Sequence, residues 1–140
     1  MNILILYNFS ISFFMLGLIL TTQIVSYPLF LKVDDSFFTI YHQSYVNKIS
    51  LIAIPVMLSE LFVSFVLFYF NISFITSLSF IIIIFIFMST FFIQVPIHNQ
   101  IQLRYNYKLI KRLVITNWIR TLLWILKSFL SIKLIYKELI

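Results

Sequence analysis

Residues 61–103 have the sequence LFVSFVLFYFNISFITSLSFIIIIFIFMSTFFIQVPIHNQIQL and contain no Asp, Glu, Lys or Arg. An α-helix rises about 1.5 Å per residue, so about 20 apolar residues cross the roughly 30 Å hydrocarbon core of a bilayer. This stretch and the apolar residues before it are long enough for two such helices, and Asn71 is the strong turn residue between them. We therefore predict two membrane spans, residues 49–70 and 74–95, joined by a tight hairpin.

The whole chain has the composition of an integral membrane protein. Of its 140 residues, 62% are hydrophobic and only 10% are charged, and the mean hydropathy is +1.08. Soluble domains have about 45–50% apolar and about 25% charged residues, and a core of this size cannot hide so much apolar surface from water. Soluble and disordered proteins are thus excluded. The absence of cysteine also excludes disulfide scaffolds, thiolate catalysis and iron–sulfur ligation.

The residues before this region predict one further span and the start of another helix. Residues 1–31 carry no charge, so we expect a span at 3–26. It should end at Tyr27-Pro28, because proline breaks the helical hydrogen-bond ladder. Asp34 then follows as a candidate N-cap, and the helix that it begins is expected to run directly into the second span.

The residues after this region predict a connection and a last span. Residues 97–112 mix basic, aromatic and amide side chains, so we expect an interfacial connection there, followed by a span at 113–132. The predicted fold class is all-α, with one transmembrane domain over residues 1–140. It is an integral membrane four-helix bundle with an additional amphipathic, interfacial helical stretch after the first span.

The net charge of +6 is expected to reflect membrane topology, with membrane lipids and not nucleic acid as partners. Basic residues are enriched in short cytoplasmic loops. The connections after the first and third spans hold six basic residues, whereas the opposite side holds only Lys133 and Lys137. We therefore predict a multi-pass protein of the inner (cell) membrane with both termini outside the cytoplasm. The six basic residues are Lys32, Lys48, Arg104, Lys108, Lys111 and Arg112.

A few polar and charged residues within the spans are candidate functional residues. A charge at the bilayer centre costs ~2.5–3.5 kcal/mol on insertion scales, so it usually faces the bundle interior. In the last span, polar residues recur at helical spacing and form one polar face, with Trp124 on it and Lys127 at its edge. We expect six side chains to converge in one leaflet under a lid of Tyr41 and His42, namely Gln23, Glu60, Gln94, His98, Asn117 and Arg120.

An alternative role for these residues is to hold the helices together. Polar side chains within bundles form interhelical hydrogen bonds worth ~0.6 kcal/mol each. Glu60 must be protonated or paired, and Arg120 and Lys127 are its candidate partners. His42, His98 and Glu60 would suit a metal ion, but His42 and Glu60 lie about 27 Å apart on a continuous helix. We therefore expect neither a metal nor another cofactor.

Several short motifs carry a family resemblance. The segments QIVSYPLF, YHQSY, PVMLSE, STFFIQVPIHNQ and TNWIRTLLW resemble a widespread group of small four-helix bacterial membrane proteins, and they are spread over nearly the whole chain. The segment VPIHNQ followed by NWIRT is also similar to the anthrone oxygenase-like membrane family. In that family a V-P-x-N-type turn precedes an N-x-x-R on the last helix. Here His98 follows Pro-Ile and Asn99 comes next, which departs from that pattern.

The second resemblance implies oxygenation of a hydrophobic phenolic or anthrone-like ring without a metal. A general base would remove a proton to give an electron-rich enolate that reacts directly with dioxygen. The implied catalytic residues are Glu60 or His98 as the base and Arg120 as a stabiliser of the oxyanion. The expected ligand-binding residues are Gln23, Tyr27, Tyr41, His42, Gln94, Asn117, Trp124 and Lys127.

The predicted function is therefore a polar intramembrane pocket for a small hydrophobic ligand, with oxygenase-like or oxidoreductase-like activity by resemblance. One alternative is a proton-coupled transporter of small solutes, in which Glu60, His98 and Arg120 pass protons. Four helices are few for a monomeric carrier, so transport would require a homo-oligomer. Another alternative is an accessory subunit of a larger membrane complex.

Overall fold

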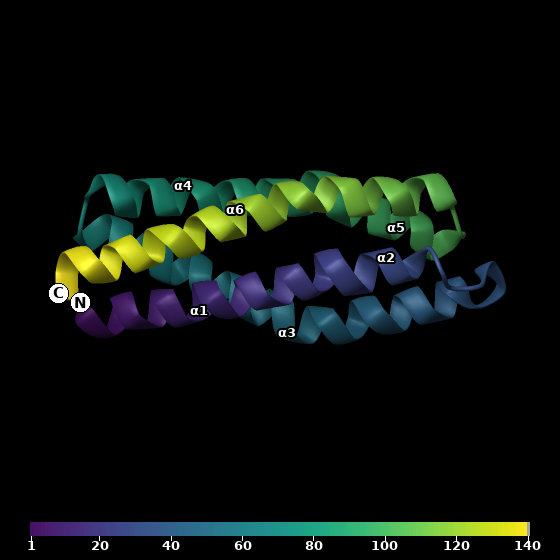
Figure 1. Ribbon diagram of the computed structural model, residues 1–140, viewed down its shortest axis with the longest axis horizontal. Coiled ribbons are helices and arrows are strands. Elements are labelled where there is room, and N and C mark those ends of the chain that lie inside the picture. The colour runs from purple at the N-terminus through teal and green to yellow at the C-terminus, as the bar shows by residue number, and fades with distance from the viewer. Residues whose placement is uncertain (140) are drawn as a thin grey trace.

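The computed structural model of the chain describes residues 1–139 as helices that run along one long axis (Figure 1). Two short π-helical turns, labelled η, interrupt otherwise α-helical rods. In chain order the elements are α1 (Asn2–Thr21), η1 (Thr22–Ser26), α2 (Tyr27–Phe30), α3 (Asp35–Phe70), α4 (Phe74–Ser89), η2 (Thr90–Gln94), α5 (Val95–Leu103) and α6 (Tyr107–Leu139).

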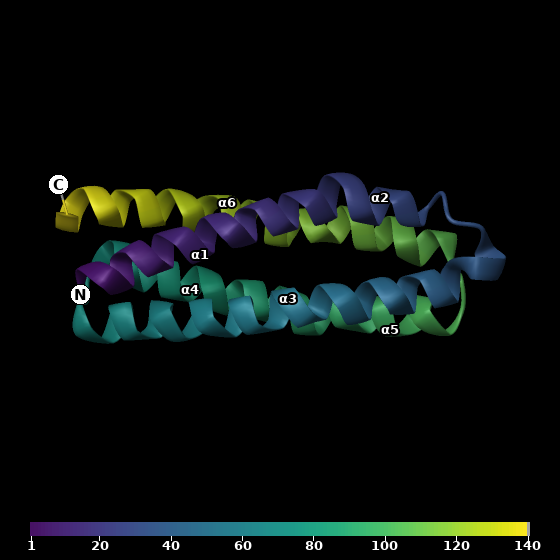
Figure 2. The same ribbon diagram turned by 90° about the horizontal axis from the view of Figure 1, so that it is seen from below.

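These elements form four rods that alternate in direction. Both chain ends and the α3–α4 turn lie at one end of the bundle, and the α2–α3 and α5–α6 connections lie at the other (Figures 1 and 2). The prediction of an all-α four-helix bundle is confirmed. Four helical stretches of the described chain are long and apolar enough to cross a membrane, namely Asn2–Phe30, Asp35–Phe70, Phe74–Leu103 and Tyr107–Glu138.

The two prolines that follow the π-helical turns, Pro28 and Pro96, lie inside these rods, as does Pro55 within α3, so the prediction that the first helix ends at Tyr27-Pro28 is wrong. A proline ring clashes with the carbonyl four residues earlier in an α-helix and supplies no N–H. The π-helical turns widen the helix just before Pro28 and Pro96, because Tyr27 N–H bonds to the Thr22 carbonyl and Val95 N–H to the Thr90 carbonyl. The chain therefore passes Pro28 and Pro96 without leaving the helix.

The predicted interfacial regions are parts of the long rods. The helical stretch after the first span is the beginning of α3, which continues without a break past Lys48 into the second span, as expected. Asp34 caps it, with its carboxylate accepting the Ser36 N–H at 2.9 Å. The expected connection at 97–112 is mostly helical, since α5 continues to Leu103 and α6 begins at Tyr107.

The α6 helix packs against both α1 and α4 and turns its polar face toward them. Three apolar clusters follow one another along the bundle axis, and the middle cluster contains Trp124, Met15 and Met57. The outer surface is covered by large apolar side chains such as Phe62 and Phe92. Such a surface would be unfavourable in water and matches the acyl chains of a bilayer.

Candidate functional site

A cavity of about 310 Å³ lies where α3 faces α1, α4 and η2. Its α3 wall includes side chains at helical spacing that share one face of the helix, namely Val46, Ile49, Ser50, Ala53 and Met57. Ala53 is the single alanine of the chain, and most of the neighbouring residues carry large side chains. The small side chains of Ser50 and Ala53 therefore leave the space that forms the cavity.

The cavity opens sideways between α3 and η2. Three residues of its lining are more than half exposed on the outside of the bundle, Ile54 at 54%, Leu58 at 53% and Phe91 at 59%. All three are apolar and lie within the rods that can span a membrane. In a bilayer this mouth would face the lipid and not the aqueous phase.

One end of the cavity is polar. Tyr27 of α2, Gln94 of η2, His98 of α5 and Arg120 of α6 all contribute to its lining. These four side chains belong to the set that the sequence predicts to bind or act on a ligand, and the fold brings them together from three rods. The cavity therefore combines an apolar body with a small group of convergent polar atoms, which is the usual character of a small-molecule site.

A chain of hydrogen bonds holds the Arg120 guanidinium at the cavity. Arg120 Nη1 donates to Asn117 Oδ1 at 3.3 Å, and Asn117 Nδ2 donates to Gln23 Oε1 at 2.9 Å. Gln23 Nε2 donates in turn to the Val114 carbonyl at 3.0 Å. Gln23 and Asn117 thus act behind the lining and fix the position of Arg120. Thr121 adds a further bond to Gln23 Oε1 at 3.3 Å.

The charge of Arg120 has no carboxylate partner within residues 1–139. The chain has four acidic residues. Glu60 and Glu138 form ion pairs with lysines, and Asp34 and Asp35 lie at the connection between α2 and α3. Arg120 is only 8% exposed. An almost buried cation without a counterion is costly in an apolar medium, so this side chain is the most unusual feature of the cavity.

Gln94 presents an acceptor at the same polar end. Its Nε2 donates to Thr116 Oγ1 at 3.2 Å. Its Oε1 is buried and accepts no hydrogen bond from the described chain, and Arg120 Nε likewise donates none there. Both atoms are buried, so each side chain would have to rotate to present its unpaired donor or acceptor to a ligand.

The two histidines lie next to each other. The Tyr27 hydroxyl is 2.9 Å from His98 Nε2, and His98 Nδ1 is 2.8 Å from His42 Nε2. His42 is fully buried and stacks on the Phe38 ring at 5.5 Å. It is therefore not the lid that the sequence predicts but the inner end of a hydrogen-bonded row that begins at the cavity.

The histidine pair does not extend into a larger ligand set. No group of three or more His, Cys, Asp or Glu side chains in residues 1–139 could hold a metal ion. Glu60 lies on the same unbroken helix as His42, so the fold keeps them far apart.

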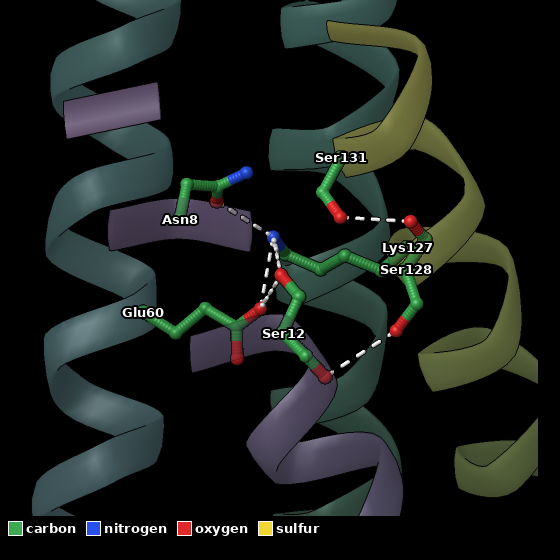
Figure 3. Close-up of polar contacts among 6 residues, drawn as sticks. All are labelled: Asn8, Ser12, Glu60, Lys127, Ser128 and Ser131. Carbon is green, nitrogen blue, oxygen red and sulfur yellow. Dashed lines mark hydrogen bonds and ion pairs between the residues drawn. The ribbon is translucent and has the colours of Figure 1, made fainter. Parts of the chain in front are cut away.

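Glu60 and Lys127 form a separate buried cluster (Figure 3). Glu60 Oε1 lies 3.0 Å from Lys127 Nζ and accepts the Ser12 hydroxyl at 2.6 Å. Lys127 also donates to Asn8 Oδ1 at 3.2 Å. Both charged side chains are 0% exposed, and neither lines the cavity. The expectation that Glu60 converges with Arg120 is therefore not met, because Glu60 lies about one turn beyond Met57 along α3 and turns to the α1–α6 interface.

Two other sequence candidates also lie away from the cavity. Trp124 is fully buried in the middle apolar cluster with Met15 and Ile19. Tyr41 is 41% exposed at the outer surface and contacts the edge of Phe30. Neither contributes to the cavity lining.

The sequence did not identify one residue of the cavity lining and two residues of the Lys127 cluster. Tyr45 lines the cavity, and Asn8 and Ser12 contact Lys127. Asn8 and Ser12 are four residues apart in an otherwise apolar helix, so their shared face was a usable signal. Tyr45 lies on the cavity face of α3 three residues after His42, but nothing in the sequence marks it as different from other interfacial tyrosines.

Comparison of the chain with protein-family models, with curated proteins and with solved structures found no match. The two resemblances stated from the sequence motifs therefore stay predictions.

Proposed function

We propose that the protein binds, within the membrane, a small and largely apolar molecule whose polar end is an acidic oxygen. The observation that carries this proposal is Arg120, a nearly buried cation at the polar end of an apolar cavity with no counterion in the described chain. An anionic oxygen on the ligand would supply the missing negative charge, and a charge-assisted hydrogen bond of this kind is stronger than a neutral one.

The other polar atoms and the size of the cavity restrict the chemical class of the ligand further. Arg120 would donate to the ligand oxygen, and the unpaired Gln94 Oε1 would accept from it after a rotation of the Gln94 amide, which suits a hydroxyl or enol that carries a hydrogen. The cavity volume of about 310 Å³ lies at the lower end of the range for ligand pockets, about 300–1,000 Å³. A ligand of two or three fused rings is a suitable size and shape.

We further propose that the site removes the proton of this oxygen or of the adjacent ring carbon. Tyr27 and His98 are the groups placed to receive it, and Arg120 is placed to stabilise the resulting anion. Glu60 is not part of this proposal, because its carboxylate bonds to Lys127 and Ser12.

Oxygenation is the reaction that the sequence resemblance implies for such an anion. A ring methylene of an anthrone would react with one dioxygen molecule to give a ring carbonyl and one water, with no metal required in the balance. Dioxygen consumption by the membrane-embedded protein with anthrone tests this step, and it should fall to the rate of empty membranes in Arg120→Gln and His98→Phe. Consumption equal in the wild type and in empty membranes would contradict the oxygenase assignment and leave ligand binding to be tested separately.

The binding experiment uses the full chain in lipid nanodiscs and 2-naphthol as a two-ring phenol probe, with empty nanodiscs as the background. Ala53→Phe fills the cavity and should abolish saturable binding, whereas Ile52→Phe on the outer face of α3 should leave it unchanged. Arg120→Gln removes a charged hydrogen bond worth about 1.5–3 kcal/mol, so binding should weaken by about 10- to 100-fold. Equal binding to the wild type and Ala53→Phe would overturn the proposal.

Proton-coupled transport is a second candidate, supported by the row of polar side chains along α6. Buried residues of this helix, from Asn117 through Lys127 to Ser131, connect the level of the cavity with the Glu60 cluster. In sealed liposomes with an internal pH dye, transport predicts solute-dependent proton entry that is lost in Glu60→Gln. If the protein binds the ligand but no solute-dependent proton entry is seen, the result would favour the binding and proton-removal function.

A further inference from the structure

Tyr27, His98 and His42 form a continuous row of hydrogen bonds that leads away from the cavity. Tyr27 lines the cavity, and its hydroxyl lies 2.9 Å from His98 Nε2. His98 Nδ1 lies 2.8 Å from His42 Nε2. Both ring nitrogens of His98 are engaged, so a neutral His98 must donate at one and accept at the other. The direction of one hydrogen bond therefore fixes the direction of the other.

Two proton arrangements satisfy this row. In the first, Tyr27 donates to His98 Nε2, His98 Nδ1–H donates to His42 Nε2, and His42 carries its hydrogen on Nδ1. In the second, His42 Nε2–H donates to His98 Nδ1, His98 Nε2–H donates to the Tyr27 oxygen, and the Tyr27 hydroxyl hydrogen points to the cavity. Both keep all three groups neutral. The first arrangement changes into the second when one proton enters at Tyr27 from the cavity and another leaves from His42 Nδ1.

We infer that Tyr27, His98 and His42 form a proton relay, and that the ligand is a weak oxygen acid, a phenol or an enol, that exchanges its proton while bound. This inference rests on the proposed binding function. The ligand O–H bond breaks, its proton passes to the Tyr27 oxygen, and the Tyr27 proton passes to His98 Nε2. The His98 Nδ1 proton passes to His42 Nε2, and the proton on the buried His42 Nδ1 would leave through a bridging water molecule that accepts it and leads to the loop end. The ligand oxygen keeps the electron pair beside Arg120, and no group is oxidised or reduced.

The position of the cavity explains why a proton would need a route through the protein. The mouth between α3 and η2 faces the lipid, so water does not reach the ligand oxygen from that side. His42 lies two turns, about 10 Å, from the start of α3 at the loop end. Its Nδ1 is buried and has no hydrogen-bond partner in the described chain, so it is the last protein atom of the row, and a buried donor of this kind is where a bridging water is expected.

The groups around the two imidazoles do not fix a charge on either of them. The titratable or charged side chains nearest to them are Tyr27 of α2, which bonds to His98, and Arg120 of α6. Tyr45 of α3 and Tyr105 of the α5–α6 connection contact Phe30 and Phe38, the rings that pack on His42. No carboxylate of residues 1–139 forms an ion pair with either imidazole. The row therefore has no ionic partner that would trap the proton on one histidine, as a relay requires.

The test separates the rate of proton exchange from ligand binding. Wild-type protein in nanodiscs is saturated with 2-naphthol, and the naphtholate absorption is followed after a rapid rise in pH. Arg120 governs the equilibrium fraction of ionised probe, whereas the relay governs how fast this fraction is reached. Positioned acid–base groups contribute about 10²–10⁴-fold to proton transfer. His42→Gln and His42→Phe should therefore slow ionisation by at least about tenfold, with unchanged binding and an unchanged final ionised fraction.

Two variants and one control make the result decisive. Gln at residue 42 keeps an amide that can bond to His98 but cannot pass a proton on, so it distinguishes relay from packing. Gln43→Phe adds a ring at the exposed neighbouring position of α3 and should ionise at the wild-type rate. Equal rates in the wild type and His42→Gln would overturn the relay while leaving the cavity function intact.

Failure of the binding function has a different signature. If wild-type protein binds 2-naphthol no better than Ala53→Phe does, the cavity does not hold this class of ligand and both proposals fall. If the wild type binds the probe but the bound probe stays un-ionised up to the pH at which free 2-naphthol is fully ionised, the weak-acid class is wrong. In that case the cavity would bind a neutral ligand.

Discussion

At the scale of single residues, the lysine at position 127 is the most constrained group of the bundle. Its side chain is fully buried and reaches Glu60, Ser12 and Asn8 at once. Removing one member of a buried ion pair leaves the other charge without compensation, which costs about 3–5 kcal/mol, whereas replacing both by apolar residues is often neutral. The pair therefore acts as a specific connection between α3 and α6 and not as a net source of stability.

This difference predicts the outcome of a double-mutant comparison. Lys127→Met alone should lower the free energy of unfolding by about 3–5 kcal/mol. The double variant Glu60→Leu with Lys127→Met should recover most of that loss, because no unpaired charge remains. Denaturant unfolding in mixed micelles measures the free energies of unfolding of the single and the double variant. Equal destabilisation of the single and double variants would show that packing and not charge governs this interface.

The sequence identified both of these charges as residues that need a partner, but it could not identify the pairing. The sequence named Arg120 and Lys127 as the two candidate partners of Glu60, and the structure shows that Lys127 is the partner. The rotation of α3 about its axis decides the pairing, and that rotation follows from packing around Met15, Met57 and Trp124. Such contacts between distant segments leave no local signal in a single sequence.

At the scale of elements, the two π-helical turns share a sequence pattern. Each begins with a threonine six residues before a proline, Thr22 before Pro28 and Thr90 before Pro96. Each threonine hydroxyl donates to the carbonyl four residues earlier, at 2.9 Å and 2.8 Å respectively. A π-helical turn contains one residue more than an α-helical turn and is frequent at functional sites. Here the two turns carry the glutamines that serve the cavity.

The extra residue makes a deletion informative. Removing Ile93 from η2 should convert the turn to α-helix and keep the flanking residues in phase, so the protein should fold but lose saturable 2-naphthol binding. Removing Ile84 from regular α4 instead rotates all later residues by about 100° relative to the core, and this variant should be strongly destabilised. Thermal unfolding of the two deletions makes the comparison, and equal loss of stability would contradict the assignment of η2 as an inserted turn.

The N-terminal cap of α3 predicts a pH dependence. The Ser36 hydroxyl and N–H both donate to Asp34, and these hydrogen bonds hold the pKa of Asp34 below its usual value of 3.8. Because the pKa is lower in the folded protein, this stabilisation is complete above the unfolded pKa and is lost as the pH falls through the folded one. Asp34→Asn keeps an acceptor that does not titrate.

The wild type should therefore lose more thermal stability than Asp34→Asn between about pH 6 and pH 3. The other carboxylates titrate in both proteins and cancel in the difference. Asp34→Ala should be less stable than the wild type at neutral pH, since it removes the cap. Parallel pH profiles for the wild type and Asp34→Asn would show that the cap does not contribute.

At the scale of the whole molecule, the four predicted spans agree with the four rods, but their ends do not. Uncharged runs of the required length leave few alternatives to a membrane bundle, so the architecture was predictable from the sequence. The span ends were misplaced at Pro28 and Pro96 because a π-helical turn has no recognised composition. The polar end of the cavity was partly predictable, since Gln94, His98 and Arg120 stand out in apolar helices, but the cavity itself depends on Ala53 and Ser50 on the opposite rod.

The distribution of basic residues predicts the orientation of the whole bundle. The loop end should face the cytoplasm and the end with both termini should not. The chain has no cysteine, so Ile72→Cys near the terminal end and Leu103→Cys at the loop end each introduce a single exposed thiol. A membrane-impermeant maleimide added to intact cells with a permeabilised outer envelope should label only Ile72→Cys. Labelling of only Leu103→Cys would reverse the orientation.

In a bilayer, the mouth between α3 and η2 would open to the lipid, so the bilayer would be the solvent from which the cavity is filled. An apolar ligand partitions into the membrane before it meets the protein, so occupancy follows moles of ligand per mole of lipid and not its aqueous concentration. Each added methylene, worth about 0.8 kcal/mol of transfer, would raise the local concentration about fourfold without any new contact. A homologous series of ligands would then rank largely by lipid solubility until the cavity is full. Doubling the lipid at constant total ligand would nearly halve the concentration that the cavity sees.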